Sequence, residues 1–220
     1  MHGVFDIVGP IMIGPSSSHT AGAVRLGLMA RKILGEEPVK AEINLHGSFA
    51  RTYRGHGTDK ALIGGILGFA PEDERIREAL HIARNKGLDF SFQTVNLEEA
   101  HPNTAVIFLT GQSGRMARVT GASVGGGNIV ISNIDGYKVE LTGQYPALIT
   151  IHHDCPGVIT KVTQILAHAE VNIAFMRVSR QNRGETAMMI MELDEQPAPE
   201  VIAECQQAAA VQYAFAIPAI

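Results

Sequence analysis

The chain has 220 residues, 45% of them hydrophobic and 18% charged, which is enough for one large or two small packed domains. Its formal net charge of −4 and the absence of a dense basic run argue against a nucleic-acid partner. No apolar stretch reaches the roughly 20 residues of a membrane helix, and the first residues lack the features of a signal peptide. We therefore expect a cytoplasmic protein with no membrane partner. The two cysteines, Cys155 and Cys205, have no metal-ligand spacing and are too few for an iron–sulfur cluster, which usually takes about four thiolates.

A serine-rich segment precedes the first expected helix. Residues 14–22 read GPSSSHTAG, and the apolar residues at helical spacing that follow predict a helix over residues 23–34. Serine and threonine at a helix start satisfy free backbone N–H groups, but one hydroxyl suffices for this purpose. The additional hydroxyls and His19 are suited to hold a small carboxylate or phosphate at the positive end of the helix. A plain N-cap in a polar loop is the alternative.

The rest of the first part mixes strands and helices without a strict alternation, which favours an α+β fold over a parallel α/β fold. The expected strands cover residues 41–45, 91–97, 105–109, 115–120 and 128–134, and the expected helices cover residues 58–68 and 74–85.

Polar loops punctuated by glycine are the candidates for chemistry in this part. They cover residues 45–48, 55–60, 100–104 and 123–128. His56 has a glycine on each side, and Asp59 and Lys60 follow closely, so other groups can approach its ring. A proton-transfer residue needs such access, which makes His56 the best candidate base. A solvent-exposed turn histidine is the alternative.

Two other catalytic interpretations fail on their context. Residues 121–125 fit the Gly-x-Ser-x-Gly pattern of hydrolases, but that pattern needs a helix after the serine, and residues 128–132 read as a strand. Lys60 could form a Schiff base with pyridoxal phosphate, yet nothing else in the sequence indicates that cofactor. We therefore expect neither a nucleophilic Ser123 nor pyridoxal phosphate.

The character of the sequence changes near residues 143–146, and the remainder predicts the order βαββαβ of a ferredoxin-like domain. A Pro-Gly turn opens the first helix of this part, and Asn172 begins its second strand. Backbone N–H groups and an amide at such an edge suit the carboxylate and ammonium of a free amino acid. A dimerisation surface without a ligand is an equal alternative.

Taken together, these loops resemble the beta chain of bacterial iron–sulfur L-serine dehydratases. The last ~75 residues are similar to an ACT domain, a βαββαβ module that senses small molecules. The preceding part is similar to the substrate-binding regulatory domain of some phosphoglycerate dehydrogenases. This resemblance predicts two domains, residues 1–146 and residues 147–220. The segments that carry it are residues 14–20, 55–60, 101–104 and 125–127 in the first part, and residues 154–159 and 171–173 in the second.

The resemblance implies deamination of L-serine to pyruvate and ammonia without pyridoxal phosphate. It implies that a 4Fe–4S cluster is held by a partner alpha chain, that this chain holds no metal, and that the ACT domain self-associates. His56 would be the base. The implied substrate-binding residues are Ser16, Ser18, His19, Thr20, Asn103 and Thr104, and the implied regulatory amino-acid site is Asp154, Gly157 and Asn172. The competing hypotheses are a non-catalytic regulatory protein that senses serine and a scaffold that only dimerises.

Overall fold

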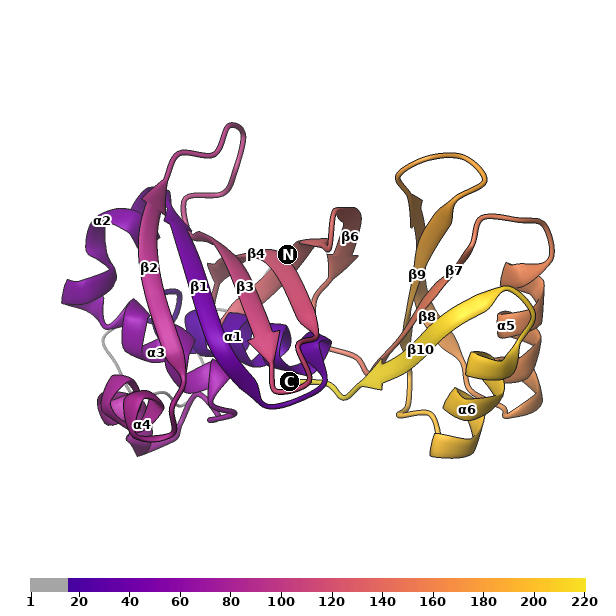
Figure 1. Cartoon of the computed structure of the whole chain (residues 1–220), viewed down its shortest axis with the longest axis horizontal. Coiled ribbons are helices and arrows are strands. Elements are labelled where there is room, and N and C mark those ends of the chain that lie inside the picture. Colours follow the sequence, from indigo (N-terminus) through magenta and orange to yellow (C-terminus); the bar gives the residue numbers. More distant parts are fainter. Residues whose placement is uncertain (1–15) are drawn as a thin grey trace. The chain divides into compact units, whose positions relative to one another are not determined.

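The computed structural model describes residues 16–220, so the first two residues of the serine-rich motif, Gly14 and Pro15, lie outside it. The chain forms two compact units, divided between Asp135 and Gly136 (Figure 1). This division lies ahead of the predicted boundary at residue 146 because strand β6 (Tyr137–Leu141) packs against strands β8 (Ile173–Arg180) and β9 (Thr186–Leu193) of the C-terminal unit. In the described part of the chain, no helix has the length and apolar character needed to cross a membrane.

Helices cover one face of a mixed sheet in the N-terminal unit (Figure 1). Within this unit the strands run in the order β2-β1-β3-β4-β5, with β1 parallel to β2 and antiparallel to β3. All five strands that the sequence predicts for this part are present. The elements are α1 (Ala21–Leu34), β1 (Pro38–His46), α2 (Gly47–His56), α3 (Thr58–Ile66), η2 (Glu74–Glu78), α4 (Ala79–Asn85), β2 (Asp89–Val95), β3 (Thr104–Gly111), β4 (Met116–Gly125) and β5 (Asn128–Ile134).

Helix α1 forms where the apolar spacing predicts it. Its apolar residues, including Leu26, Met29 and Ile33, are at most 2% exposed, and this stripe faces strands β3, β4 and β5. The helix ends at Gly35, whose φ of 79° is the left-handed conformation that glycine adopts without strain. The burial of this helix fixes the position of the serine-rich turn before it.

The backbones of α1 and α3 approach each other closely through two glycines. A Cβ atom on Gly27 would lie 2.2 Å from the carbonyl oxygen of Leu62, and one on Gly65 would lie 2.0 Å from the carbonyl oxygen of Val24. Real side chains cannot occupy such positions, so these glycines are required by packing rather than by backbone conformation.

The structure differs from the sequence prediction around residues 47–56 and 74–85. Helix α2 includes residues 47–48 and 55–56, which were expected in polar loops, and residues 49–54, for which no element was predicted. It was missed because only Phe49 of its ten residues is buried. The expected helix over residues 74–85 begins as the 3₁₀ helix η2 and becomes α-helical only at Ala79.

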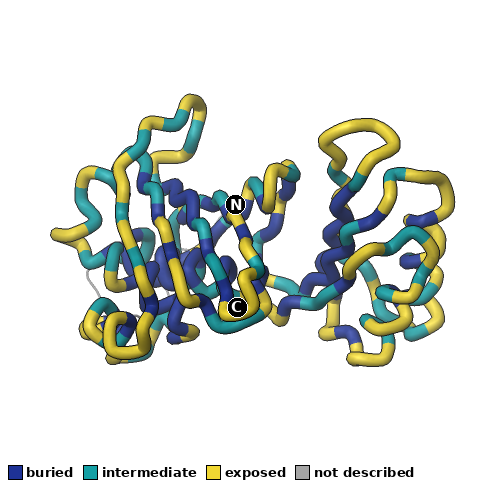
Figure 2. Tube along the Cα trace, viewed as in Figure 1, coloured by how far each residue is buried: buried dark blue, intermediate teal, exposed yellow. Residues whose placement is uncertain are grey.

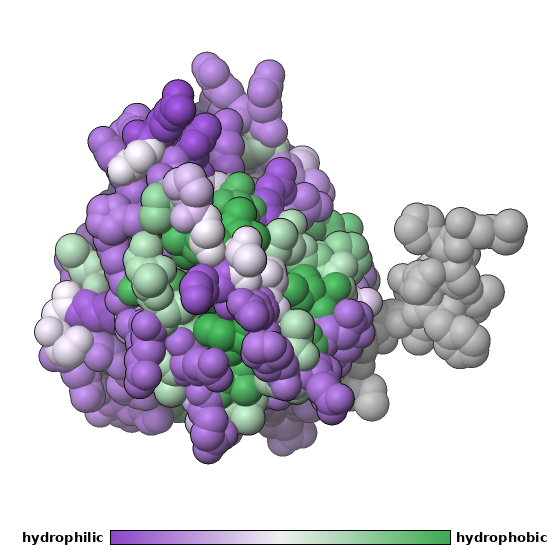
Figure 3. Space-filling model, turned by 90° about the vertical axis from the view of Figure 1, so that its right-hand side faces the viewer, coloured by the Kyte–Doolittle hydropathy of each residue, from purple (hydrophilic) through white to green (hydrophobic). Residues whose placement is uncertain are grey.

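The C-terminal unit confirms the βαββαβ order and the ferredoxin-like fold. Its four-stranded sheet has the order β10-β7-β9-β8, so β8 and β10 are the edge strands. β9 is buried along nearly its whole length (Figure 2). The side of the molecule shown in Figure 3 is largely hydrophilic, with smaller hydrophobic areas between the polar side chains. The elements are β7 (Ala147–His153), α5 (Val158–His168), β8 (Ile173–Arg180), β9 (Thr186–Leu193), α6 (Pro199–Gln207) and β10 (Val211–Ile217).

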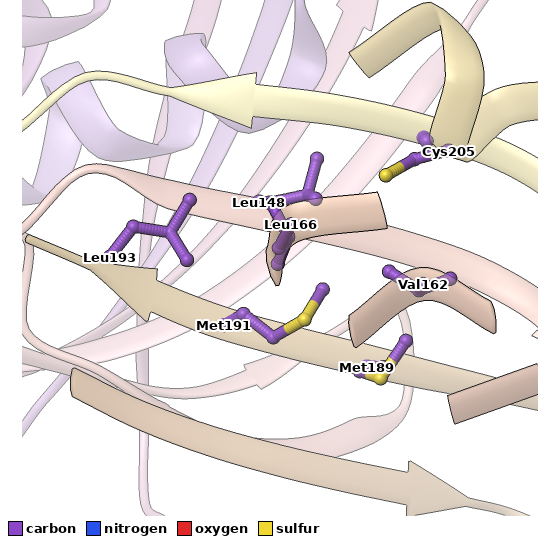
Figure 4. Packing of buried hydrophobic residues seen from close by; sticks show 8 residues of the cluster. Leu148, Val162, Leu166, Met189, Met191, Leu193 and Cys205 are labelled. Atoms are coloured by element: carbon purple, nitrogen blue, oxygen red, sulfur yellow. The ribbon is translucent and has the colours of Figure 1, made fainter. Parts of the chain in front are cut away.

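The core of this unit lies between the sheet and its two helices (Figure 4). Its residues come from β7, β9, β10, α5 and α6, and Cys205 is among them. Burial raises the pKa of the Cys205 thiol to about 11. Cys205 is therefore a neutral packing residue, and not a thiolate ligand, at physiological pH.

We expect Gly65→Ala to destabilise the chain because the added methyl group overlaps the backbone of α1. Overpacking of this kind costs about 2 kcal/mol or more of unfolding free energy. Denaturant unfolding of the full chain measures the loss. Gly55→Ala is the matched control, because Gly55 is also helical but has no atom within 4 Å of its Cβ position. Equal stability of the two variants would contradict the close packing of α1 and α3.

Candidate active site

The serine-rich turn caps helix α1 mainly through its backbone, and its Ser16 hydroxyl accepts a long hydrogen bond, at 3.4 Å, from the N–H of His19. The N–H of Thr20 donates to the carbonyl of Ser16 at 2.9 Å, and the N–H of Gly22 donates to the carbonyl of Ser17 at 2.9 Å. Thr20 is the N-cap residue, yet its side chain makes no capping hydrogen bond. The surplus of hydroxyls predicted from the sequence is therefore real, and plain capping does not explain it.

His19 is the centre of the site. It is 9% exposed, and each ring nitrogen lies 3.3 Å from a serine hydroxyl: Nδ1 from Ser16 and Nε2 from Ser48. Burial lowers the pKa of His19, and electrostatic repulsion from the adjacent His56 lowers it further. His19 is thus held as a neutral ring between the serine-rich turn and the first turn of α2.

His56 lies beside His19. Their ring centroids are 4.8 Å apart and their planes are nearly perpendicular, at 85°. His56 is the last residue of α2 and is exposed, whereas Phe49, from the same helix, packs on the His19 ring at 5.3 Å. The next residue, Gly57, ends the helix with a φ of 73°. The structure therefore pairs a buried histidine with an exposed one.

The segment around Pro102 holds the start of α2 in place. The N–H of Ser48 donates to the carbonyl of Pro102 at 2.7 Å. A Cβ atom on Gly47 would lie 2.6 Å from the same oxygen, and the φ of Gly47 is 58°. This close approach brings the segment before β3 to the segment that carries Ser48.

Asn103 and Ser123 join the site from the strand side. The N–H of Ser123 donates to the carbonyl of Asn103 at 3.1 Å, and the Asn103 amide donates to the carbonyl of Ser123 at 3.5 Å. A Cβ atom on Gly22 would lie 2.0 Å from Ser123 Oγ, so this hydroxyl lies against the first turn of α1. The Thr104 hydroxyl donates to the carbonyl of His101 at 2.7 Å and ties down its own loop.

Several buried polar atoms of this region have no hydrogen-bond partner among residues 16–220. They include Thr20 Oγ1, Asn103 Oδ1 and Ser123 Oγ. Buried polar groups are normally paired, and each unpaired one costs about 1–3 kcal/mol. Hydroxyls in this state beside a helix N-terminus are suited to a small anion.

Two residues of this region were not predicted as binding residues from the sequence. Ser48 was part of an expected polar loop, but its contact with His19 depends on the unpredicted helix α2. Ser123 was considered only as a nucleophile and rejected, and the structure agrees that β5 rather than a helix follows its strand. The Gly-x-Ser-x-Gly spacing does not predict that the Ser123 hydroxyl packs against Gly22 of α1.

Asp59 and Lys60 follow His56 closely in the sequence and lie in the first turn of α3, within the helix predicted over residues 58–68. The Lys60 N–H donates to Asp59 Oδ1 at 2.8 Å. Desolvation raises the pKa of Asp59, and hydrogen bonds and nearby cations partly oppose this. No contact described for either residue joins it to His56.

The described residues offer no metal site. Between residues 16 and 220 there is no group of three or more His, Cys, Asp or Glu side chains placed to hold a metal ion. Cys155 is exposed and Cys205 is buried in the C-terminal core. These residues do not fit an iron–sulfur cluster.

The residues expected to bind a regulatory amino acid occupy different places in the C-terminal unit. Asp154 accepts hydrogen bonds from the Gly184 N–H at 3.0 Å and from Arg180 at 2.8 Å, and both interactions lower its pKa. Asn172 donates to Asp194 at 2.7 Å. Because Asn172 precedes β8 and Arg180 ends it, they are roughly 25 Å apart along the strand. Gly157, which has a φ of 94° and is the N-cap of α5, follows Asp154 by three residues.

The fold and the site define a two-part α+β chain, with a histidine- and hydroxyl-lined site in the first part and an ACT-like second part. Residues 3–133 match the family described as Serine dehydratase beta chain, and residues 148–211 match the AHAS small subunit-like ACT domain. The chain belongs to the serine dehydratase beta chain family. The resemblance seen in the sequence is thereby confirmed.

Individual relatives agree with this assignment. The chain is 46% identical over 192 residues to "Probable L-serine dehydratase, beta chain" of Bacillus subtilis (strain 168), with 87% of each chain covered. It is 40% identical over 195 residues to "L-serine dehydratase, beta chain" of Peptoniphilus asaccharolyticus, with 88% of each covered. It is also 26% identical to a D-3-phosphoglycerate dehydrogenase of Synechocystis sp. (strain ATCC 27184 / PCC 6803 / Kazusa), over 89% of this chain and 35% of that protein.

We predict that replacing His56 by Asn raises the pKa of His19, because a nearby positive charge is removed. The pKa should stay below about 6.5, the ordinary histidine value, since burial is the larger cause of its depression. NMR titration of the ring protons measures the pKa of His19 in the unmodified chain and in His56→Asn. An unchanged His19 pKa in His56→Asn would contradict the coupling, and the exposed His81→Asn is the control that should leave it unchanged.

The same depression makes stability depend on pH. Because the folded-state pKa of His19 lies below its unfolded value, the unfolded chain binds the proton first as the pH falls. His19 therefore contributes stability that is complete above about pH 6.5 and is lost as the pH drops toward the folded-state value.

Proposed function

We propose that the chain is the beta subunit of a two-chain, cytoplasmic L-serine dehydratase that converts L-serine to pyruvate and ammonia. The observation that carries the proposal is the contact of His56 with His19 beside unpaired hydroxyls. An anion site alone needs the hydroxyls but not an exposed histidine next to a buried neutral one. The family membership and the names of its relatives support the same conclusion.

In this proposal His56 removes the Cα proton of L-serine. The Cα–H bond breaks, its electron pair forms the Cα=Cβ bond, and the hydroxyl leaves Cβ as water after taking up a proton. The resulting aminoacrylate tautomerises to an imine, which water hydrolyses to pyruvate and ammonia. A Cα proton is weakly acidic, so the base must be well placed. The exposed position of His56 at the end of α2 suits such access.

The hydroxyls and the N-terminus of α1 hold the substrate carboxylate in this proposal. Ser16, Ser18 and Thr20 come from the turn before the helix, and Asn103 comes from the segment before β3. His19, kept neutral by burial, can donate its single ring N–H to the carboxylate without adding charge, in exchange for its contact with Ser16 or Ser48. Thr104 acts indirectly, because its hydroxyl already binds the carbonyl of His101.

The alpha chain is proposed to hold the 4Fe–4S cluster and to activate the substrate hydroxyl. The described residues of this chain do not fit that cluster. No step assigned here to His56 or to the hydroxyls depends on pyridoxal phosphate.

The C-terminal unit is proposed to bind an amino acid between two copies of the chain. Asp154 and Gly157 lie near one end of β8 and Asn172 lies at the other. A ligand that contacts all three would need Asn172 from a second copy. Self-association through this unit is part of the proposal. It is supported by the edge strands β8 and β10, neither of which pairs with a further strand of its sheet within the described chain.

The first test is anaerobic affinity purification of this chain from its own cells, with the eluate assayed for pyruvate from L-serine. We expect an active complex with a cysteine-bearing second chain, and a loss of about 100-fold or more in kcat for His56→Asn. His81→Asn is the matched control, since His81 is exposed on α4. A chain that binds serine but forms no pyruvate, even after cluster reconstitution, would favour a serine sensor and overturn the proposal.

Ser18→Ala should raise the KM for L-serine about tenfold or more with little effect on kcat. Loss of a hydrogen bond to a charged group weakens binding by about 1.5–3 kcal/mol. Ser91→Ala, on the exposed surface of β2, is the control. Steady-state kinetics of the complex measure KM and kcat for both variants. An unaltered KM for Ser18→Ala would count against carboxylate binding by this hydroxyl.

A further inference from the structure

Gly55 is a glycine for which the chain itself gives no structural reason. It lies within helix α2, and its φ is not among the positive values that favour glycine. No atom lies within 4 Å of its Cβ position. A glycine inside a helix is less favourable than alanine, because it loses more conformational entropy on folding. A side chain would therefore fit here and would help the helix.

The neighbouring Gly57 shows the contrast. Gly57 has a φ of 73° and ends α2, so its backbone conformation requires glycine. The glycines of α1 and α3 are required by close packing inside the unit. Neither reason applies to Gly55. Glycines that break a local rule are expected at functional surfaces, where another backbone approaches closely.

The surface around Gly55 carries more positive than negative charge: three cations surround it, and Asp59 is the carboxylate that interacts with two of them, Arg54 and Lys60. Arg51, Arg54 and Lys60 are all exposed, and the sequence of α2 contains no Asp or Glu. Arg54 lies over the ring of Tyr53, with its guanidinium carbon 5.4 Å from the ring centroid, which holds one of these cations on the helix surface. A surface of this kind attracts an acidic partner and repels a basic one.

We propose that Gly55 is the point at which the backbone of an acidic segment of the alpha chain packs against α2. The missing side chain allows that segment to reach the helix surface directly beside His56, and Arg51, Arg54 and Lys60 pair with its carboxylates. The proposal rests on the proposed function, because it takes the alpha chain as the partner. It adds to that function a defined contact point and the charge of the surface that meets it.

The experiment compares the affinity of purified full-length variants for the alpha chain. Gly55→Leu should raise the Kd at least tenfold. Ala203→Leu, which adds a leucine at an exposed position of α6, should leave the Kd unchanged. Arg51→Glu should also raise the Kd, whereas Arg183→Glu, an exposed charge reversal in the C-terminal unit, should not. The Tm of the uncomplexed Gly55→Leu chain should lie within about 2 °C of the unmodified chain, which separates lost binding from lost folding.

The outcomes separate the two proposals. If the unmodified chain binds no alpha chain, both the proposed function and the contact at Gly55 are overturned. If it binds the alpha chain and Gly55→Leu binds equally well, only the contact at Gly55 is overturned. A lowered Tm with weakened binding would also overturn it, because Gly55 would then have a structural reason inside the chain.

Discussion

The contact between the backbones of α1 and α3 determines the geometry on which the candidate site depends. Helices normally pack about 8–10 Å apart with side chains between them, but Gly27 and Gly65 allow carbonyl oxygens to lie where Cβ atoms would be. Such a contact leaves little freedom for either helix to slide or rotate. The serine-rich turn begins α1, and His56 comes two residues before α3 begins. Fixing the two helices therefore also fixes the region where His19 and His56 meet.

The two histidines differ in environment, and that difference defines what each can do. His19 is buried, has a hydroxyl near each ring nitrogen and is kept neutral. His56 is exposed and open to a substrate. A base needs a free ring nitrogen, which His19 lacks as long as Ser16 and Ser48 remain in place. This difference supports the proposed roles of His56 as the base and His19 as its neutral neighbour. The sequence had already favoured His56 as the base through its flanking glycines, but it did not show that the two rings meet.

The elements whose buried residues recur with a helical or strand period could be predicted from the sequence. Helix α2, which buries a single residue, could not. The stripe of α1 and the alternating strands are set by burial, which leaves a pattern in the residues. Helix α2 buries only Phe49, and its position depends on the carbonyl of Pro102, about fifty residues away. Contacts of that range leave no local pattern. For the same reason the meeting of Ser48 with His19, and of Ser123 with Gly22, could not be read from the sequence.

The candidate binding residues of the two units differ in how far the chain itself satisfies their hydrogen bonds. In the N-terminal unit, Thr20 and Ser123 have buried hydroxyls without a partner among the described residues, at a cost in stability that a bound anion would remove. In the C-terminal unit, Asp154 and Asn172 lie at opposite ends of β8 and each satisfies its hydrogen bonds locally. The two situations are physically different. Unpaired hydroxyls favour a ligand strongly, whereas residues that are already paired must exchange one hydrogen bond for another, which gives little net free energy. Strong binding is therefore expected at the unpaired hydroxyls of the N-terminal unit, whereas at the proposed two-copy site of the C-terminal unit a ligand would gain its affinity from the second copy.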